Sequence, residues 1–167
     1  MAEERTFPHG YFWFNIRGVP DQAGQLRIET EQVDGAEGAW TDDLSGMLAL
    51  LSLQWAAAHR LGVEPDGPAL PDVVHVARGS LEAETVMMAR LPERMAGDSG
   101  WHLRLAGPLT EYAHDYETLT VRELCRERRG LVWPMSLPAG LIVQMQGDSI
   151  QAVLNKKGRD VWNASTS

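Results

Sequence analysis

The chain has 167 residues, of which 44% are hydrophobic and 23% charged, and its formal net charge is −8 at pH 7. This length and composition indicate one ordinary folded domain and exclude an intrinsically disordered chain. The acidic charge disfavours nucleic acid as a partner, and a single cysteine excludes a disulfide framework. The charged N-terminus has no apolar signal core and the most apolar stretch is too short to span a bilayer, so we expect a cytoplasmic protein without a membrane partner.

The acidic charge is concentrated in the first half of the chain. Residues 1–78 hold 12 acidic and 5 basic side chains, a net charge of −7, whereas residues 79–167 hold 11 acidic and 10 basic side chains. A field of this sign attracts basic partners, although acidity also serves solubility alone.

Two strands and a helix are predicted in the first 62 residues. Tyr11 to Arg17 is rich in aromatic residues, Gly18 to Asp21 has the composition of a turn, and Leu26 to Gln32 alternates like a half-buried strand. The helix is predicted from Leu44 to Leu61, with Gly62 as its stop. Its predicted buried stripe consists of Leu44, Leu48, Leu51 and Trp55, widened by Met47 and Leu50.

A proline-rich segment at residues 63–71 is the best linker candidate. We expect any division of the chain to fall there, giving an N-terminal strand–strand–helix segment (1–70), an α+β region (71–155) and a polar tail (156–167) within one compact unit. Strands are predicted at 72–78, 84–91 and 101–106, with residues 92–100 as a loop.

The second helix has the clearest local signature. Thr120 and Glu123 form a capping box, Val121, Leu124 and Cys125 form an apolar face, and Gly130 closes the helix. Two further strands, 141–146 and 149–155, flank a two-residue turn. These elements predict an α+β protein with a mainly antiparallel sheet and two helices packed on one side.

No catalytic grouping is evident in the sequence. Asp98, Ser99 and His102 lie within five residues, but triads are assembled from distant elements, so a turn is the better interpretation. The histidines lack metal-binding spacing, and the glycines form no phosphate-binding loop. Arg122 and Arg129 could favour a Cys125 thiolate, but its place on an apolar helix face favours a core role. We therefore expect no enzyme activity, no metal and no cofactor.

The second half of the chain resembles the bacterial immunity-protein family numbered thirty-three. The resemblance rests on Met88-Ala89-Arg90, Pro92, Asp98-Ser99-Gly100-Trp101 and Gly107, followed by Glu111-Tyr112, Pro134 and Leu137-Pro138-Ala139-Gly140. It covers about Val73 to Met145. The motif residues that it marks are Arg90, Asp98, Ser99, Gly100, Trp101, Gly107 and Gly140, of which Arg90 and Trp101 are expected to be structural.

This resemblance implies a non-catalytic protein that binds and neutralises a cognate bacterial toxin. The acidic first half would suit a basic toxin. We expect contacts in a tyrosine-rich loop, at Glu111, Tyr112, Asp115 and Tyr116. The alternative is a small-molecule-binding protein or small enzyme whose pocket is lined by Trp13, Trp40, Trp55, Met87 and Met88.

Overall fold

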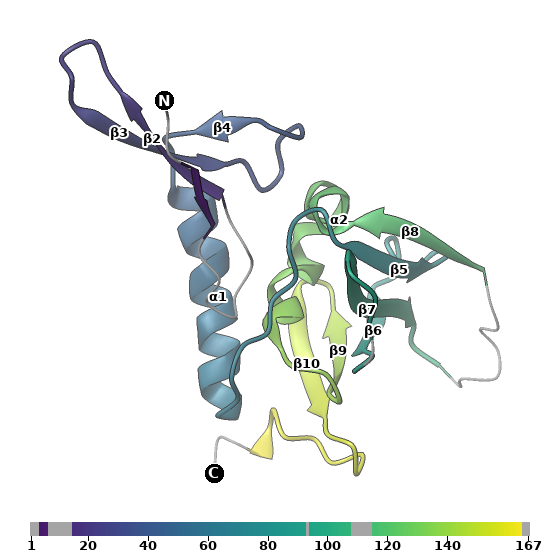
Figure 1. Cartoon of the computed structure of the whole chain (residues 1–167). Coiled ribbons are helices and arrows are strands. Elements are labelled where there is room, and N and C mark those ends of the chain that lie inside the picture. Colours follow the sequence, from purple (N-terminus) through teal and green to yellow (C-terminus); the bar gives the residue numbers. More distant parts are fainter. Residues whose placement is uncertain (1–3, 7–14, 93, 108–114, 165–167) are drawn as a thin grey trace.

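The computed structural model describes residues 4–6, 15–92, 94–107 and 115–164. It is an α+β fold with two α-helices and two sheets, which confirms the predicted class (Figure 1). The four-stranded sheet has the order β1-β2-β3-β4 and the six-stranded sheet the order β10-β9-β6-β7-β5-β8. The prediction of one antiparallel sheet did not anticipate this division, nor the parallel pairing of β5 with β7 in the larger sheet.

The elements have the following bounds. The smaller sheet and the first helix comprise β1 (Glu4–Thr6), β2 (Asn15–Pro20), β3 (Leu26–Glu31), β4 (Trp40–Thr41) and α1 (Ser45–Leu61). The larger sheet comprises β5 (Val73–Ala77), β6 (Thr85–Arg90), β7 (Asp98–Leu105), β8 (Tyr116–Thr120), β9 (Ile142–Gln146) and β10 (Ser149–Leu154). Between β8 and β9 lie α2 (Val121–Arg128) and the short 3-10 helices η2 (Arg129–Leu131) and η3 (Trp133–Ser136).

Two local predictions were wrong in position. The first turn lies after β2, where the Asp21 carboxylate accepts hydrogen bonds from the backbone N–H groups of Ala23 and Gln25, so Gly18 belongs to the strand. The predicted loop at 92–100 ends earlier, because β7 begins at Asp98. The predicted strand at 11–17 lies largely outside the described residues. Its last three positions, 15–17, are described and belong to β2.

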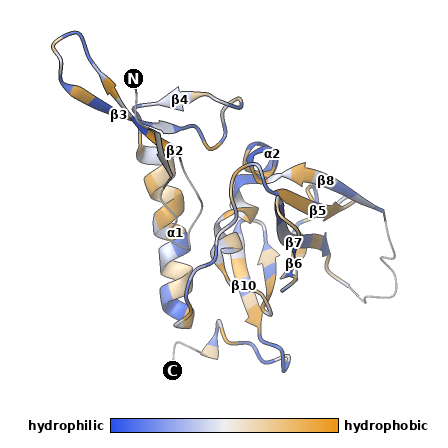
Figure 2. Ribbon diagram, viewed as in Figure 1, coloured by the Kyte–Doolittle hydropathy of each residue, from blue (hydrophilic) through white to orange (hydrophobic). Residues whose placement is uncertain are grey.

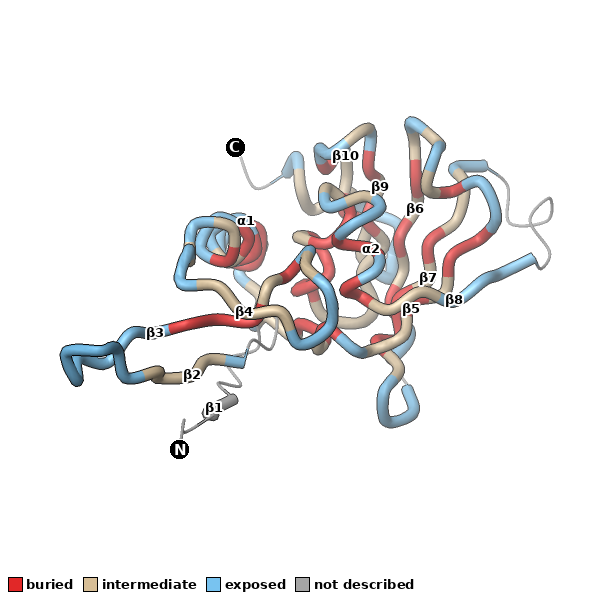
Figure 3. Tube along the Cα trace, turned by 90° about the horizontal axis from the view of Figure 1, so that it is seen from above, coloured by how far each residue is buried: buried red, intermediate tan, exposed pale blue. Residues whose placement is uncertain are grey.

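The hydrophobic core lies between one face of the larger sheet and the layer formed by α2, η2 and η3. Alternate residues of β5 and β7, such as Val74, Val76 and Leu103, have no exposed surface and point into this core. Seen from above, α2 lies between α1 and the strands of the larger sheet (Figure 3). α1 packs on η3, on the outer side of this layer. The helices therefore cover one face of the larger sheet.

The buried face of α1 differs from the predicted stripe. Leu48 and Trp55 are 53% and 55% exposed, so their assignment to the core was wrong. The sequence could not identify the buried face of this helix, because apolar residues lie on nearly every side and the periodicity does not single out one face. The side chains that α1 buries are Met47, Leu50, Gln54, Ala57 and Ala58.

The capping box of α2 is present as predicted. The Thr120 hydroxyl accepts a hydrogen bond from Glu123 N at 3.1 Å, and the Glu123 carboxylate accepts one from Thr120 N at 2.7 Å. The pKa of the Glu123 carboxyl is lowered, chiefly by this bond from the Thr120 backbone. The cap thereby fixes where β8 ends and α2 begins.

Arginines on α2 and η2 hold the N-terminal segment against the rest of the fold. Arg122 forms an ion pair with Glu31 and donates to the Gln32 carbonyl at 2.7 Å. Arg126 donates to the Gly35 carbonyl, and Arg129 donates to the Gly46 carbonyl at 2.8 Å. These three arginines thus connect the loop after β3 and the start of α1 to α2 and η2. The division near residue 70 stays a prediction.

Cys125 provides a test of core packing. Its thiol is buried, and burial raises its pKa to about 12 despite the opposing charges of Arg129 and Arg122. Because the thiolate is the reactive form, we expect the native protein to resist a thiol-specific reagent at pH 8 and to react at the rate of unfolding. Fast labelling without loss of native circular dichroism would contradict this packing.

Candidate protein-binding surface

Arg90 connects three distant segments of the chain. Its side chain is 1% exposed, and its guanidinium donates to the carbonyls of Ser99 at 3.0 Å and Leu137 at 3.3 Å, and to the carbonyl of Asp66. The Asp66 carboxylate also lies 3.1 Å from Nη1. Burial lowers the pKa of Arg90, while the Asp66 charge acts in the opposite direction. The linker, the start of β7 and the segment after η3 meet at this group.

Ser99 and Trp101 are buried on the core face of β7. The Ser99 hydroxyl donates to the Val73 carbonyl at 2.6 Å and accepts from Trp101 N at 3.1 Å. The Trp101 indole has no exposed surface and donates to the Met135 carbonyl at 3.0 Å. A hydroxyl whose proton is held by a carbonyl has no base to activate it, so this serine is not arranged as a nucleophile.

Gly100 occupies a conformation that requires glycine. Its φ is +73°, and a Cβ at this position would lie 2.9 Å from the Leu91 carbonyl oxygen. Asp98 supports the turn, because its Oδ1 accepts from Gly100 N at 2.7 Å. The strand still pairs here, since Leu91 N donates to the Gly100 carbonyl. Of the remaining motif glycines, Gly107 follows β7 and accepts a bond from Arg104, and Gly140 precedes β9 beside Lys156.

The opposite face of the same strands carries a polar and aromatic cluster. His75 Nε2 lies 3.2 Å from Asp98 Oδ2, and the His75 and His102 rings stack with centroids 4.5 Å apart. Tyr116 completes the cluster with its ring edge-on to His102 at 5.8 Å. We call these four residues the histidine–tyrosine cluster. It lies on the sheet face away from α2, and its members come from β5, β7 and β8.

The electrostatics of the cluster favour neutral imidazole at His102. Burial lowers the pKa of His102, and the neighbouring His75 lowers it further, against the Asp98 charge. Burial alone would raise the pKa of Asp98, but the bonds from Gly100 N and His75 outweigh it and the net direction is downward. The cluster therefore presents a carboxylate with two stacked imidazoles.

The predicted contact residues fall partly on this surface. Tyr116 is 39% exposed and belongs to the cluster. Asp115 is exposed and pairs with Arg78 at 3.2 Å beside it. Glu111 and Tyr112 lie outside the described residues. The sequence pattern places His102 on the polar face of the predicted 101–106 strand, but neither His75 nor His102 was predicted as a binding residue. Both alternate with core residues, and that pattern could have pointed to the outer face.

The four described residues proposed for the alternative pocket lie on separate elements or on opposite faces of one strand. Trp40 lies on β4 under the Arg17 guanidinium, Trp55 is exposed on α1, and Met87 and Met88 point to opposite faces of β6. Trp13 lies outside the described residues. A different groove of about 900 Å³ runs between α1 and the β9–β10 turn. Its lining includes Leu50, Leu53, Trp133, Ile150 and Trp162.

Among the residues that the structure describes, no three His, Cys, Asp or Glu side chains form a group that could hold a metal ion. In the same part of the chain, no helix combines the length and apolar character needed to cross a bilayer.

The fold and this surface define an α+β protein with a packed motif on one sheet face and a partly exposed cluster on the other. Residues 53–164 match the model of the Imm33-like domain, which covers most of the chain, so the protein belongs to the Imm33-like family. The resemblance stated from Val73 to Met145 is thereby confirmed and extended at both ends. Searches of curated proteins and of solved structures returned no match.

The Arg90 network yields a stability prediction. We expect Arg90→Met to lower the free energy of unfolding by about 3 kcal/mol, because it leaves buried carbonyls without donors. Arg78→Met is the matched control, since Arg78 is exposed and its ion pair is worth at most about 1 kcal/mol. Urea denaturation measures both, and equal effects of the two substitutions would contradict the proposed role of Arg90.

The lowered pKa of His102 predicts a pH effect on stability. The unfolded chain binds this proton more tightly than the native state, so the contribution of His102 destabilises the fold as pH falls below about 6.5. We expect His102→Gln to lose less stability than the wild type between pH 7.5 and 5. Denaturant titrations across this range measure it, and a steeper loss in the variant would refute the assignment.

Proposed function

We propose that this protein is an immunity protein that binds a bacterial toxin domain and neutralises it without catalysis, in the cytoplasm. Membership of an immunity-domain family supports this proposal. So does the arrangement around Ser99, where the only nucleophile-like group of the motif is consumed by backbone hydrogen bonds. An inhibitor of this kind needs a rigid surface with aromatic and charged groups rather than a reacting centre.

The surface that we assign to the toxin is the outer face of β5, β7 and β8. Its centre is the histidine–tyrosine cluster, and Arg104 and Met87 extend it as a cross-strand pair on the same face. This face lies directly behind the buried motif, so the Asp98–Gly100 turn and Trp101 hold its strands in place. Asp115 and Tyr116 lie at its edge, and we propose that Glu111 and Tyr112 contribute to it as well.

The charge distribution adds a partner class to this proposal. Seven of the eight net negative charges belong to residues 1–78, and a field of this sign accelerates the approach of a basic protein. We therefore propose a basic toxin domain. Residues 1–70 would act as an accessory segment and 71–155 as the toxin-binding region of one compact unit.

Capture of a toxin is the direct test. The protein is mixed with the product of the neighbouring gene, and rescue of cells that express that product is scored in parallel. We expect the double variant His102→Ala/Tyr116→Ala to weaken binding at least about tenfold, since central aromatic contacts dominate interface energies.

The control removes an exposed apolar side chain elsewhere. Leu26→Ala alters a residue that is 71% exposed on the β2–β3 hairpin, and we expect wild-type affinity from it. Circular dichroism must show that each variant is folded. A double variant that binds and protects as well as the wild type would remove this face from the proposal, and failure to bind or rescue at all would remove the function.

A further inference from the structure

The outward side of α1 is an apolar surface without charge. Residues 44–59 contain no Asp, Glu, Lys or Arg. Leu48 and Trp55 are 53% and 55% exposed on it, and the hydropathy colouring shows orange and white over much of the helix (Figure 2). A solvent-facing helix ordinarily carries charged side chains on its exposed face, and an extended apolar face marks an interaction site.

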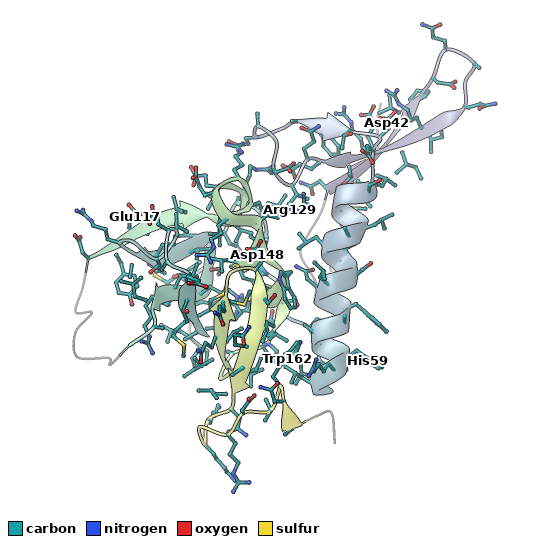
Figure 4. The ribbon with its side chains drawn as sticks, turned by 180° about the vertical axis from the view of Figure 1, so that it is seen from behind. Asp42, His59, Glu117, Arg129, Asp148 and Trp162 are labelled. Carbon is teal, nitrogen blue, oxygen red and sulfur yellow. The ribbon has the colours of Figure 1, made fainter. Side chains whose placement is uncertain are left out.

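The two ends of this helix carry opposite charge. Asp42 and Asp43 are exposed just before its first turn, whereas Arg60 is exposed in its last turn, where it also donates to the Trp162 carbonyl at 2.9 Å. Figure 4 shows Asp42 and His59 at the two ends of α1. A second α1 running antiparallel would bring acidic ends against basic ends, while a parallel one would bring like charges together.

The pattern between these ends is self-complementary about its midpoint. Ser52 is exposed, and it lies nearly midway between Leu48 and Trp55. A two-fold axis at Ser52 therefore sets Leu48 of each copy against Trp55 of the other, with the small serine where the helices approach most closely. The ring of Trp55 is already ordered by stacking on His59 at 4.8 Å, so little side-chain entropy is lost on contact.

We propose that this face binds a second copy of the chain, forming a homodimer through antiparallel α1 helices. The self-complementary charge favours this occupant over a basic toxin, because the centre of the face offers no acidic group to a basic partner. Repulsion between two chains of charge −8 is largely screened at physiological ionic strength, while the contact itself is uncharged. The assigned toxin face lies on the other side of the fold, so the two surfaces are independent.

Molecular mass in solution gives the first test. Sedimentation or light scattering across a dilution series should show the wild type as a dimer. Leu48→Asp should give a folded monomer, because it buries an unpaired charge at the contact. Leu26→Asp, on the β2–β3 hairpin, should leave the dimer intact. A monomeric wild type at every concentration would overturn the proposal and leave the face to another partner, such as the toxin.

Engineered cysteines test the orientation. Ser52→Cys should form a disulfide-linked dimer under mild oxidation, because two copies of this residue meet at the axis. Ser45→Cys is the matched control on the same exposed side. In an antiparallel pair its two copies would be about 21 Å apart along the helices, beyond the reach of a disulfide. The native Cys125 is buried and does not compete. Cross-linking of both variants would indicate parallel helices, and cross-linking of neither would remove the interface; either result overturns the proposal.

Discussion

One buried cation determines how the Imm33-like fold is held together. Arg90 ends β6, and its guanidinium donates to carbonyls of residues 66, 99 and 137, which are brought from the linker, from β7 and from the segment after η3. Two of these carbonyls, those of Asp66 and Leu137, lie outside the helices and strands, and the third belongs to β7. A planar group with five donors satisfies several such carbonyls at once, which a lysine could not do. The backbone conformation at Gly100 orients the preceding Ser99 carbonyl toward the guanidinium.

The strands of the larger sheet bury the motif residues on one face and present the histidine–tyrosine cluster on the other. Ser99 and Trp101 point into the core, whereas Asp98 and His102 point outward toward His75 and Tyr116. A face supported from behind in this way is pre-organised, and pre-organisation reduces the entropy lost when a partner binds. This is the physical reason for connecting a motif with no exposed reactive group to a function in binding.

The N-terminal segment is held to the rest of the fold by polar contacts of arginine side chains. These arginines lie on α2 and η2. They donate to backbone carbonyls in the loop after β3 and form ion pairs with Glu31 and Asp34. The first part of this segment, up to residue 52, lies outside the family match. It carries nine acidic and three basic side chains and the first part of the uncharged face of α1, whereas Trp55 lies within the match.

The sequence alone determined the local features whose causes are local. The capping box at Thr120 and Glu123, the glycine stop after α1 and the turn between β9 and β10 depend on neighbouring residues only, and so does the resemblance through Asp98 to Trp101. The tertiary structure decided which side of α1 is buried, since an apolar residue at each of several positions satisfies the same periodicity. It also decided that His75 and His102 stack, because they come from strands 27 residues apart that pair in parallel, and that pairing depends on long-range contacts no local pattern records.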